Sequence, residues 1–318
     1  MLSHRPLGRS GITIAPLMFG GNVFGWTADE ATSFKMLDVF VAGGFNAIDT
    51  ADVYSRWVPG HQGGESETIV GKWVASRKKR ESVVIATKAG SDMGKAGKGL
   101  SKAHITAAVE ASLKRLQTEY IDLYQSHIDD DSVPVEETLQ TYAGLIQAGK
   151  VRAIGASNFT AARLAQSLAA SARLGLPRYE TLQPEYNLME RAGFETDLQG
   201  LCAQEHIGAI TYFSLSKGFL TGKYRNEADL GKSPRGGGVK AYLASARGQA
   251  VLAALDQIAA ESKGTPAQVA LAWLMSRTAV AAPIASATTV PQLEEIMGAA
   301  RLNLSLEAIA RLTAASAT

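Results

Sequence analysis

Short apolar runs alternate with longer stretches of helical periodicity along this chain. The apolar runs are rich in β-branched residues and cover 15–21, 45–50, 82–88, 121–127, 151–157, 181–186, 208–214 and 279–285. Helical spacing of apolar residues predicts helices near 29–42, 66–78, 101–116, 135–148, 160–174, 195–206, 246–261, 266–277 and 289–300. Strands that alternate with helices over the whole chain predict a (β/α)8 TIM barrel in a single domain of residues 1–318, with a doubly wound open sheet as the alternative.

Two details refine the pattern. Ser101 precedes the helical stretch in which Ile105, Val109 and Leu113 recur, so it is the expected N-cap. Residues 225–248 follow the seventh predicted strand and are rich in glycine and charge. Because long loops in compact domains commonly carry function, we expect a mobile flap there.

Composition narrows the classes of partner. The 318 residues are 46% apolar with a net charge of +2, which gives no reason to expect nucleic acid or an anionic membrane. Cys202 is the only cysteine, which excludes an internal disulfide and a thiolate metal cluster. No signal peptide and no run of about 20 apolar residues is visible. We expect a cytoplasmic protein with a small-molecule partner and no metal.

Polar residues mark the carboxyl ends of the predicted strands. Asp49 ends the second strand and Tyr54 follows it, Lys88 ends the third strand and His127 ends the fourth. Further along, Ser157, Asn158, Gln183 and Tyr212 occupy equivalent places. In a barrel these ends meet on one rim, where active sites lie. Each residue alone has an ordinary structural explanation, but so many polar groups on one rim predict a site.

These residues carry a family resemblance. The segments "GFNAIDTADVY", "IATKAG", "LYQSH", "GASNF" and "LQPEYN", in this order, resemble the aldo-keto reductase family, as do "RPLGRSGITIAPLMFGG" and "KGFLTGKY". The resemblance covers nearly the whole chain and points to the subgroup with potassium-channel β-subunit-like proteins and general carbonyl reductases. It implies a barrel that binds a nicotinamide cofactor without a glycine-rich Rossmann loop, and no G-x-G-x-x-G opens a helix here.

The resemblance also implies catalytic roles. Tyr54 would donate the proton to the developing alkoxide, and an adjacent Lys88 ammonium would favour the phenolate and lower the pKa of Tyr54. Asp49 would hold Lys88 charged, and His127 would orient the carbonyl oxygen. The same tyrosine would accept a proton in alcohol oxidation, so these residues do not determine the direction of the reaction.

The expected cofactor residues follow from the same resemblance. Ser157, Asn158 and Gln183 would bind the nicotinamide amide, and Tyr212 would stack on its ring. Where the family commonly has a cation for the 2′-phosphate, this chain has Thr288 and Gln292, with the Ser286 and Thr289 hydroxyls nearby. These hydroxyls and the start of the helix near Val290 can still hold a phosphate, and Arg235, Lys240 or Arg247 can supply the missing charge. We favour NADP(H) as the cofactor because the family commonly uses it, and NAD(H) is the alternative. The remaining predicted cofactor residues are Gly21, Ser214, Leu215, Lys217, Gly218, Lys223, Ser286 and Glu295.

About ten extra residues separate Tyr54 from Glu67, compared with the family pattern. We expect Trp57 and His61 of this insertion to line a substrate pocket; the alternative is a solvated surface loop.

The functional hypothesis is therefore an NAD(P)(H)-dependent oxidoreductase that reduces aldehydes or ketones to alcohols, or catalyses the reverse. A cofactor-binding interaction protein of the channel β-subunit type is the alternative. A Schiff-base isomerase or aldolase is disfavoured, because Lys88 beside Asp49 would stay charged. The sequence does not identify the substrate or the oligomeric state.

Overall fold

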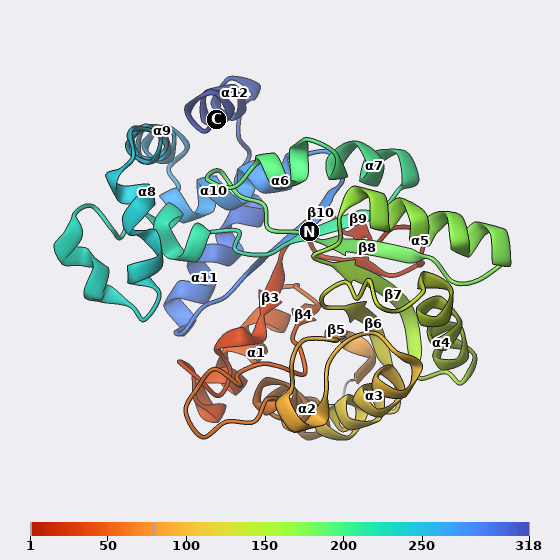
Figure 1. The fold of residues 1–318 in the computed structure, drawn as a ribbon. Coiled ribbons are helices and arrows are strands. Elements are labelled where there is room, and N and C mark those ends of the chain that lie inside the picture. Colours follow the sequence, from red (N-terminus) through yellow and green to blue (C-terminus); the bar gives the residue numbers. More distant parts are fainter. Residues whose placement is uncertain (1, 79, 318) are drawn as a thin grey trace.

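Eight parallel strands close into a barrel in the computed structural model, which describes residues 2–78 and 80–317 (Figure 1). Their order around the barrel is β10-β3-β4-β5-β6-β7-β8-β9, so strands that follow one another in sequence are neighbours and β10 closes against β3. Each strand overlaps one predicted range, and the predicted (β/α)8 barrel is confirmed. The strands are β3 (Met18–Gly20), β4 (Ala47–Asp49), β5 (Val84–Ala89), β6 (Ile121–Ser126), β7 (Val151–Ser157), β8 (Tyr179–Gln183), β9 (Gly208–Thr211) and β10 (Val280–Ala285).

Helices surround the barrel (Figure 1). Ser101 is the N-cap of α3, and its hydroxyl accepts a hydrogen bond from the backbone N–H of His104 at 3.3 Å, as the sequence predicts. The predicted helix 195–206 is two helices, because the chain bends at Thr196 and Asp197, which have low helix propensity. The helices to this point are α1 (Glu30–Ala42), α2 (Glu65–Arg77), α3 (Lys102–Leu116), α4 (Val135–Gln147), α5 (Ala161–Leu174), α6 (Ala192–Glu195) and α7 (Leu198–Glu205).

A short hairpin closes the amino-terminal end of the barrel. Strands β1 (Arg5–Pro6) and β2 (Thr13–Ile14) are antiparallel, and Leu7, Ile12 and Ile14 pack with the inward-facing apolar side chains of the barrel. The sequence pattern did not predict this hairpin, because two-residue strands are too short to show alternation. The hairpin thus covers the amino-terminal end of the barrel with apolar side chains.

The segment after β9 folds across the opposite end of the barrel. It contains three 3₁₀ turns, Ser216–Thr221, Glu227–Lys232 and Gly236–Val239, and then α8 (Lys240–Ala244) (teal in Figure 1). The predicted flap, 225–248, is thus made of short helical turns. We call residues 213–248 the flap from here on. The hydroxyls of Tyr224 and Ser233 bond at 2.6 Å within it, and Arg225 pairs with Asp256 at 2.7 Å.

The chain ends in further helices that support the last strand. These are α9 (Ala246–Ser262), α10 (Pro266–Met275), α11 (Val290–Gly298) and α12 (Leu306–Ala315), of which α12 was not predicted. Throughout the described ranges, no helix has the length and apolar character needed to span a membrane.

Candidate active site

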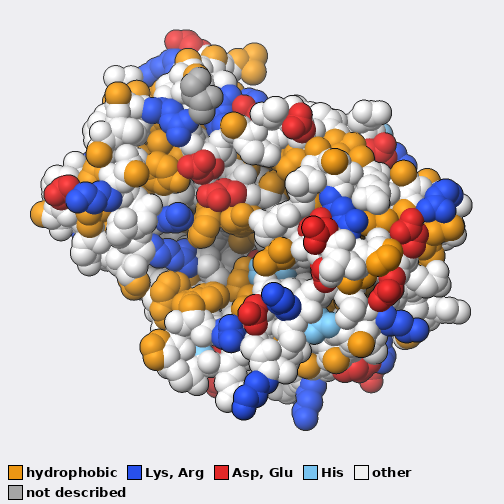
Figure 2. Space-filling model, viewed as in Figure 1, with side chains coloured by type: hydrophobic (Ala, Val, Ile, Leu, Met, Phe, Trp, Pro, Cys, Tyr) orange, Lys and Arg blue, Asp and Glu red, His pale blue; other side chains and the backbone are white. Residues whose placement is uncertain are grey.

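A cavity of about 1070 Å³ opens at the carboxyl ends of the strands, under the flap. Hydrophobic side chains and Lys or Arg side chains gather around this hollow (Figure 2). Three predicted site residues, Gly21, His61 and Lys88, are not among those that line it. The predicted residues that line it are Asp49, Tyr54, Trp57, His127, Ser157, Asn158, Gln183, Tyr212, Ser214, Leu215, Lys217, Gly218, Lys223, Ser286, Thr288, Gln292 and Glu295.

Lys88 lies fully buried behind Tyr54 on the cavity floor. Its ammonium donates to Asp49 Oδ2 at 2.8 Å, to the backbone oxygen of Thr50 at 2.7 Å and to the Tyr54 hydroxyl at 3.2 Å. Parallel pairing places Asp49 of β4 opposite Ala86 of β5. Lys88 lies two residues after Ala86, so its long side chain can reach back to the Asp49 carboxylate. Two neighbouring strands and the loop after β4 therefore hold the Asp49 carboxylate and the Tyr54 hydroxyl against the Lys88 ammonium.

Burial and the contacts of Lys88 together determine the protonation states of Tyr54 and Lys88. Burial is the largest influence on Tyr54 and raises the pKa of its phenol above the usual value, although Lys88 opposes this. The sequence analysis predicted that Lys88 lowers the pKa of Tyr54. Lys88 does act in that direction, but burial outweighs it and the net change is upward. Burial by itself lowers the pKa of Lys88, but Asp49 and Tyr54 outweigh it and the net direction is upward. Near neutral pH the Tyr54 phenol is therefore protonated and lies beside the charged Lys88 ammonium.

His127 stands next to Tyr54 at the end of β6. The ring centroids are 6.1 Å apart. Burial, and then the Lys88 charge, lower the pKa of His127 to about 3, so the imidazole is neutral near pH 7. Its Nδ1 is buried and has no hydrogen-bond partner within the described part of the chain.

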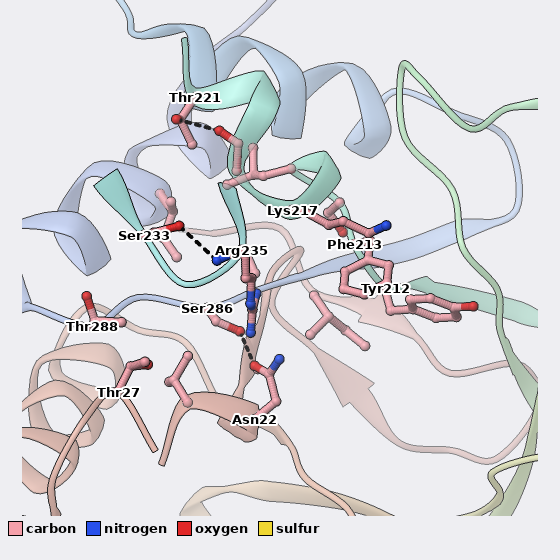
Figure 3. Close-up of a pocket in the computed structure, with 18 of the residues that line it drawn as sticks. Asn22, Thr27, Tyr212, Phe213, Lys217, Thr221, Ser233, Arg235, Ser286 and Thr288 are labelled. Atoms are coloured by element: carbon pink, nitrogen blue, oxygen red, sulfur yellow. Dashed lines mark hydrogen bonds between the residues drawn. The ribbon is translucent and has the colours of Figure 1, made fainter. Parts of the chain in front are cut away.

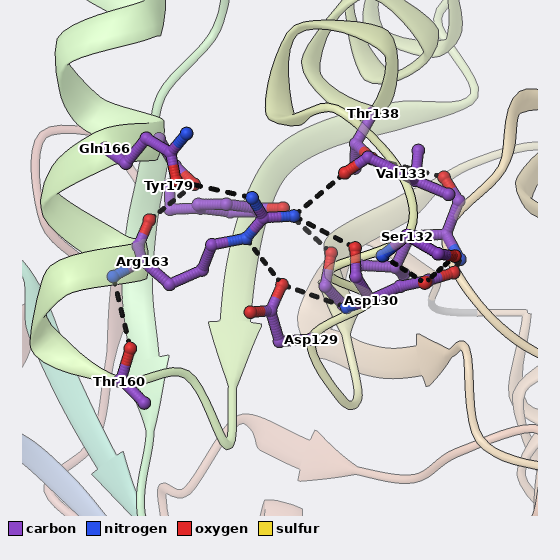
Figure 4. Close-up of polar contacts among 12 residues, drawn as sticks. Asp129, Asp130, Ser132, Val133, Thr138, Thr160, Arg163, Gln166 and Tyr179 are labelled. Atoms are coloured by element: carbon purple, nitrogen blue, oxygen red, sulfur yellow. Dashed lines mark hydrogen bonds and ion pairs between the residues drawn. The ribbon is translucent and has the colours of Figure 1, made fainter.

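The loop after His127 is attached to α5 by one arginine (Figure 4). Arg163 Nε donates to Asp129 Oδ1 at 2.9 Å, and its Nη2 donates to the backbone oxygens of Asp130 and Val133 at 2.9 Å. Sequence reasoning did not find this anchor, since an Arg on a helix face has no local signature. It restrains the loop that carries His127.

Polar residues at the ends of β7 and β8 and directly after β9 are hydrogen-bonded to one another, to Asp49 and to the backbone of His127. Gln183 Nε2 donates to Asp49 Oδ1 at 2.9 Å, and Ser157 Oγ donates to the backbone oxygen of Gln183 at 2.9 Å. Asn158 donates to the backbone oxygen of His127 at 2.9 Å and accepts from the Tyr212 hydroxyl at 2.9 Å. The ends of five strands, β4, β6, β7, β8 and β9, are thereby linked around Asp49 and His127.

The opposite end of the cavity lies at the start of α11 (Figure 3). Ser286 Oγ donates to Asn22 Oδ1 at 2.7 Å. The backbone N–H and hydroxyl of Thr288 both donate to Gln292 Oε1 at 3.0 Å. The hydroxyls expected to meet a phosphate are thus bonded to neighbouring side chains here.

Cations of the flap line the cavity between these two ends. Arg235 extends into it (Figure 3), with its guanidinium 5.3 Å from the Trp26 ring centroid, and burial lowers its pKa. Within residues 2–78 and 80–317, neither Arg235 nor Lys217 nor Lys223 forms an ion pair, although all three line the cavity. Of the other two flap cations considered, Lys240 pairs with Glu227 at 3.2 Å and Arg247 donates to the backbone oxygen of Met189 at 2.8 Å. Neither lines the cavity.

Sequence reasoning missed several lining residues. Asn22, Trp26 and Thr27 come from the loop after β3, and Phe213 and Ser233 come from the flap. Asn22, Trp26, Thr27 and Phe213 lie a few residues after strand ends, but no motif singled them out. Ser233 lies far beyond the end of β9 and had no local signal. In the described residues, no group of three or more His, Cys, Asp or Glu side chains could hold a metal ion.

Comparison with known proteins agrees with this geometry. A family model described as "Aldo/keto reductase family" matches residues 16–317. The chain is 34% identical over 342 residues to "Protein tas" of Escherichia coli, covering 99% of this chain and 97% of that protein. It is 33% identical over 307 residues to "Probable voltage-gated potassium channel subunit beta" of Arabidopsis thaliana, covering 94% and 91%. It is 31% identical over 322 residues to "Norsolorinic acid reductase" of Aspergillus flavus, covering 96% and 79%. The chain belongs to the aldo/keto reductase family.

Proposed function

We propose that this protein is an NADP(H)-dependent reductase of aldehydes or ketones in which Tyr54 is the proton donor. The observation that carries the proposal is the buried Lys88 ammonium, which contacts both the Asp49 carboxylate and the Tyr54 hydroxyl at the cavity floor. A bound nicotinamide cofactor supplies or accepts the hydride. The chain has to supply the proton, the orientation of the carbonyl and the exclusion of water.

Each catalytic side chain has a task that its environment supports. Tyr54 stays protonated near neutral pH because burial raises its pKa, so it can donate to the developing alkoxide. The Lys88 ammonium stabilises the phenolate that remains after this transfer. Neutral His127 offers a hydrogen bond to the carbonyl oxygen and adds no charge that would compete with Lys88. The paired, charged Lys88 is a poor Schiff-base nucleophile.

The cations of the cavity fit a phosphate-bearing cofactor. Lys217, Lys223 and Arg235 form no ion pair with a carboxylate in the described chain, so their charges are available to an anion that enters the cavity. We assign Arg235 to the phosphates of NADP(H), as the guanidinium that Thr288 and Gln292 cannot supply. Ser157, Asn158 and Gln183 would hold the nicotinamide amide, which requires Gln183 to share its bond to Asp49.

The direction of the reaction should depend on pH. Reduction needs protonated Tyr54, whereas alcohol oxidation needs the phenolate. Because burial moves the pKa of Tyr54 upward, oxidation should accelerate as the pH rises toward that value, and reduction should not.

The deciding experiment is NADPH consumption with simple aldehydes by the parent protein and by Tyr54→Phe. We expect Tyr54→Phe to lower kcat/KM by roughly 10²–10⁴ while the NADPH dissociation constant stays within about twofold, since only the proton donor is removed. Tyr120→Phe is the matched control, because Tyr120 contacts Arg80 rather than the cavity. A Tyr54→Phe variant with parental turnover would contradict the assignment.

The channel β-subunit alternative retains support from the Arabidopsis relative, whose name states that it is a probable channel subunit. Tight NADPH binding without turnover of any aldehyde or ketone would favour this alternative.

A further inference from the structure

The inserted segment 55–64, between Tyr54 and α2, is a folded loop held at both ends. The Glu65 carboxylate accepts hydrogen bonds from the backbone N–H groups of Ser55 at 3.2 Å, Gln62 at 2.8 Å and Gly63 at 3.0 Å. Gly63 has φ +95°, and a Cβ there would lie 2.8 Å from the backbone oxygen of Asp52. The loop therefore has a defined conformation beside the catalytic tyrosine.

Side-chain contacts add to this anchoring. His61 Nδ1 and Ser55 Oγ bond at 3.1 Å within the loop. Arg56 Nη1 donates to the backbone oxygen of Asp92, in the loop after β5, at 3.1 Å. His61, expected in the substrate pocket, instead stabilises the loop. Trp57 lies between these anchors and is the side chain that the loop presents to the cavity.

Trp57 forms a row of aromatic rings with Tyr54 and Trp26. Its ring centroid is 5.7 Å from that of Tyr54 and 5.6 Å from that of Trp26, both in edge-to-face geometry. All three side chains line the cavity, so this side of the cavity is an aromatic surface that includes Tyr54. Aromatic rings pack favourably on such a surface, in stacked or edge-to-face geometry.

Trp57 exposes apolar area to the cavity. It lines the cavity and, with 47% of its surface exposed, is one of four large hydrophobic side chains of the described chain that are exposed. An exposed apolar surface beside a reaction centre is a binding surface more often than a structural accident. The acidic residues that line the cavity are Asp49, which is paired with Lys88, and Glu295 of α11. Sugar hydroxyls would find no free carboxylate beside Trp57.

We infer that Trp57 is a specificity-determining residue, which selects carbonyl compounds whose carbonyl group is attached to a planar aromatic ring. The ligand ring packs against the Trp57 indole while its carbonyl oxygen reaches Tyr54 and His127. This assignment rests on the proposed reductase function and specifies the substrate class of the same site.

The test compares benzaldehyde with cyclohexanecarbaldehyde and propanal as substrates of the parent protein and of Trp57→Ala and Trp57→Phe. We expect the ratio of kcat/KM for benzaldehyde over cyclohexanecarbaldehyde to fall about three- to tenfold in Trp57→Ala, the size of one aromatic pair. Trp57→Phe should retain most of this ratio. Leu306→Ala, which shortens an 86% exposed leucine on α12, should leave the ratio unchanged.

Two further readouts separate the possible failures. The NADPH dissociation constant, followed by cofactor emission, should agree between the parent and the Trp57 variants if the fold is intact. Saturation-transfer NMR with benzyl alcohol and the holoprotein reports ring binding without turnover. No turnover of any aldehyde, with benzyl alcohol binding that Trp57→Ala abolishes, would reject the reductase and keep the aromatic site. Turnover with a ratio that Trp57→Ala does not change would reject the role of Trp57 and keep the reductase.

Discussion

The two ends of the cavity are built in different ways. At the catalytic end, defined by Asp49, Tyr54, Lys88 and Gln183, polar groups of three strands and one adjoining loop bond to one another, and Lys88 is fully buried. At the α11 end, defined by Ser286, Thr288, Gln292 and Glu295, the side chains are half-buried or exposed and belong to a loop and a helix. The first end is fixed by the barrel itself, whereas the second depends on the flap for its charges.

The difference in rigidity between the two ends suits the different tasks that we propose for them, proton transfer at the Lys88 end and phosphate binding at the α11 end. A proton donor must be held near its ammonium within a fraction of an ångström, and neighbouring parallel strands provide that precision. Phosphate recognition tolerates more freedom, because flexible cations can approach an anion from several directions. Substitutions should therefore have large effects on turnover at the catalytic end and moderate effects on affinity at the α11 end.

The largest effect should come from Lys88→Met. We expect kcat/KM to fall by roughly 10²–10³, because the phenolate formed at Tyr54 loses its counter-charge. The free energy of unfolding should also fall by about 3 kcal/mol, because Asp49 is left buried and unpaired. Aldehyde reduction and urea denaturation measure the two losses.

The double variant Lys88→Met/Asp49→Asn is the matched control for this prediction. It removes the unpaired charge, so stability should recover while activity stays low. Recovery of activity together with stability would mean that Lys88 acts only by supporting the fold, and the comparison between the two ends would fail.

An intermediate effect should follow from Arg235→Gln on the flap. We expect the NADPH dissociation constant to rise about tenfold, as for the loss of one charge-assisted hydrogen bond. Fluorescence titration at two salt concentrations measures it, and the parent should lose more affinity in high salt than the variant. Lys240→Gln is the control on the same segment, since Lys240 is paired with Glu227. Equal effects of both variants would argue against a specific role of Arg235.

The smallest effect should come from Thr288→Arg at the α11 end. A guanidinium there would add a second cation for the 2′-phosphate, so preference for NADPH over NADH should rise by about three- to tenfold. The ratio of the two dissociation constants measures it, with Glu294→Gln on the exposed face of α11 as the control. An unchanged ratio would mean that the 2′-phosphate does not lie at the start of α11, and it would weaken the assignment of NADP(H).

The amino-acid sequence by itself determined the barrel and which polar residues lie at the carboxyl ends of its strands. Apolar runs and helical spacing are local properties, so they predicted each barrel strand and most helices. Because the carboxyl ends of the strands of a barrel meet on one rim, the strand pattern predicted that Asp49, Lys88, His127 and Gln183 lie close together. The two-residue strands β1 and β2 escaped detection, since they are too short to show a period.

Only the tertiary structure decided how these groups interact. The contacts of Arg163 with the loop after His127 and of Arg235 with Trp26 join segments that lie 34 and 209 positions apart in the chain. The net pKa direction of Tyr54 required the balance of burial against the Lys88 charge, and burial is a property of the packed molecule. His61 and Trp57 belong to the same insertion, yet one anchors the loop and the other lines the cavity. Local patterns reveal the elements, whereas the direction of a side chain and its surroundings exist only after those elements have packed.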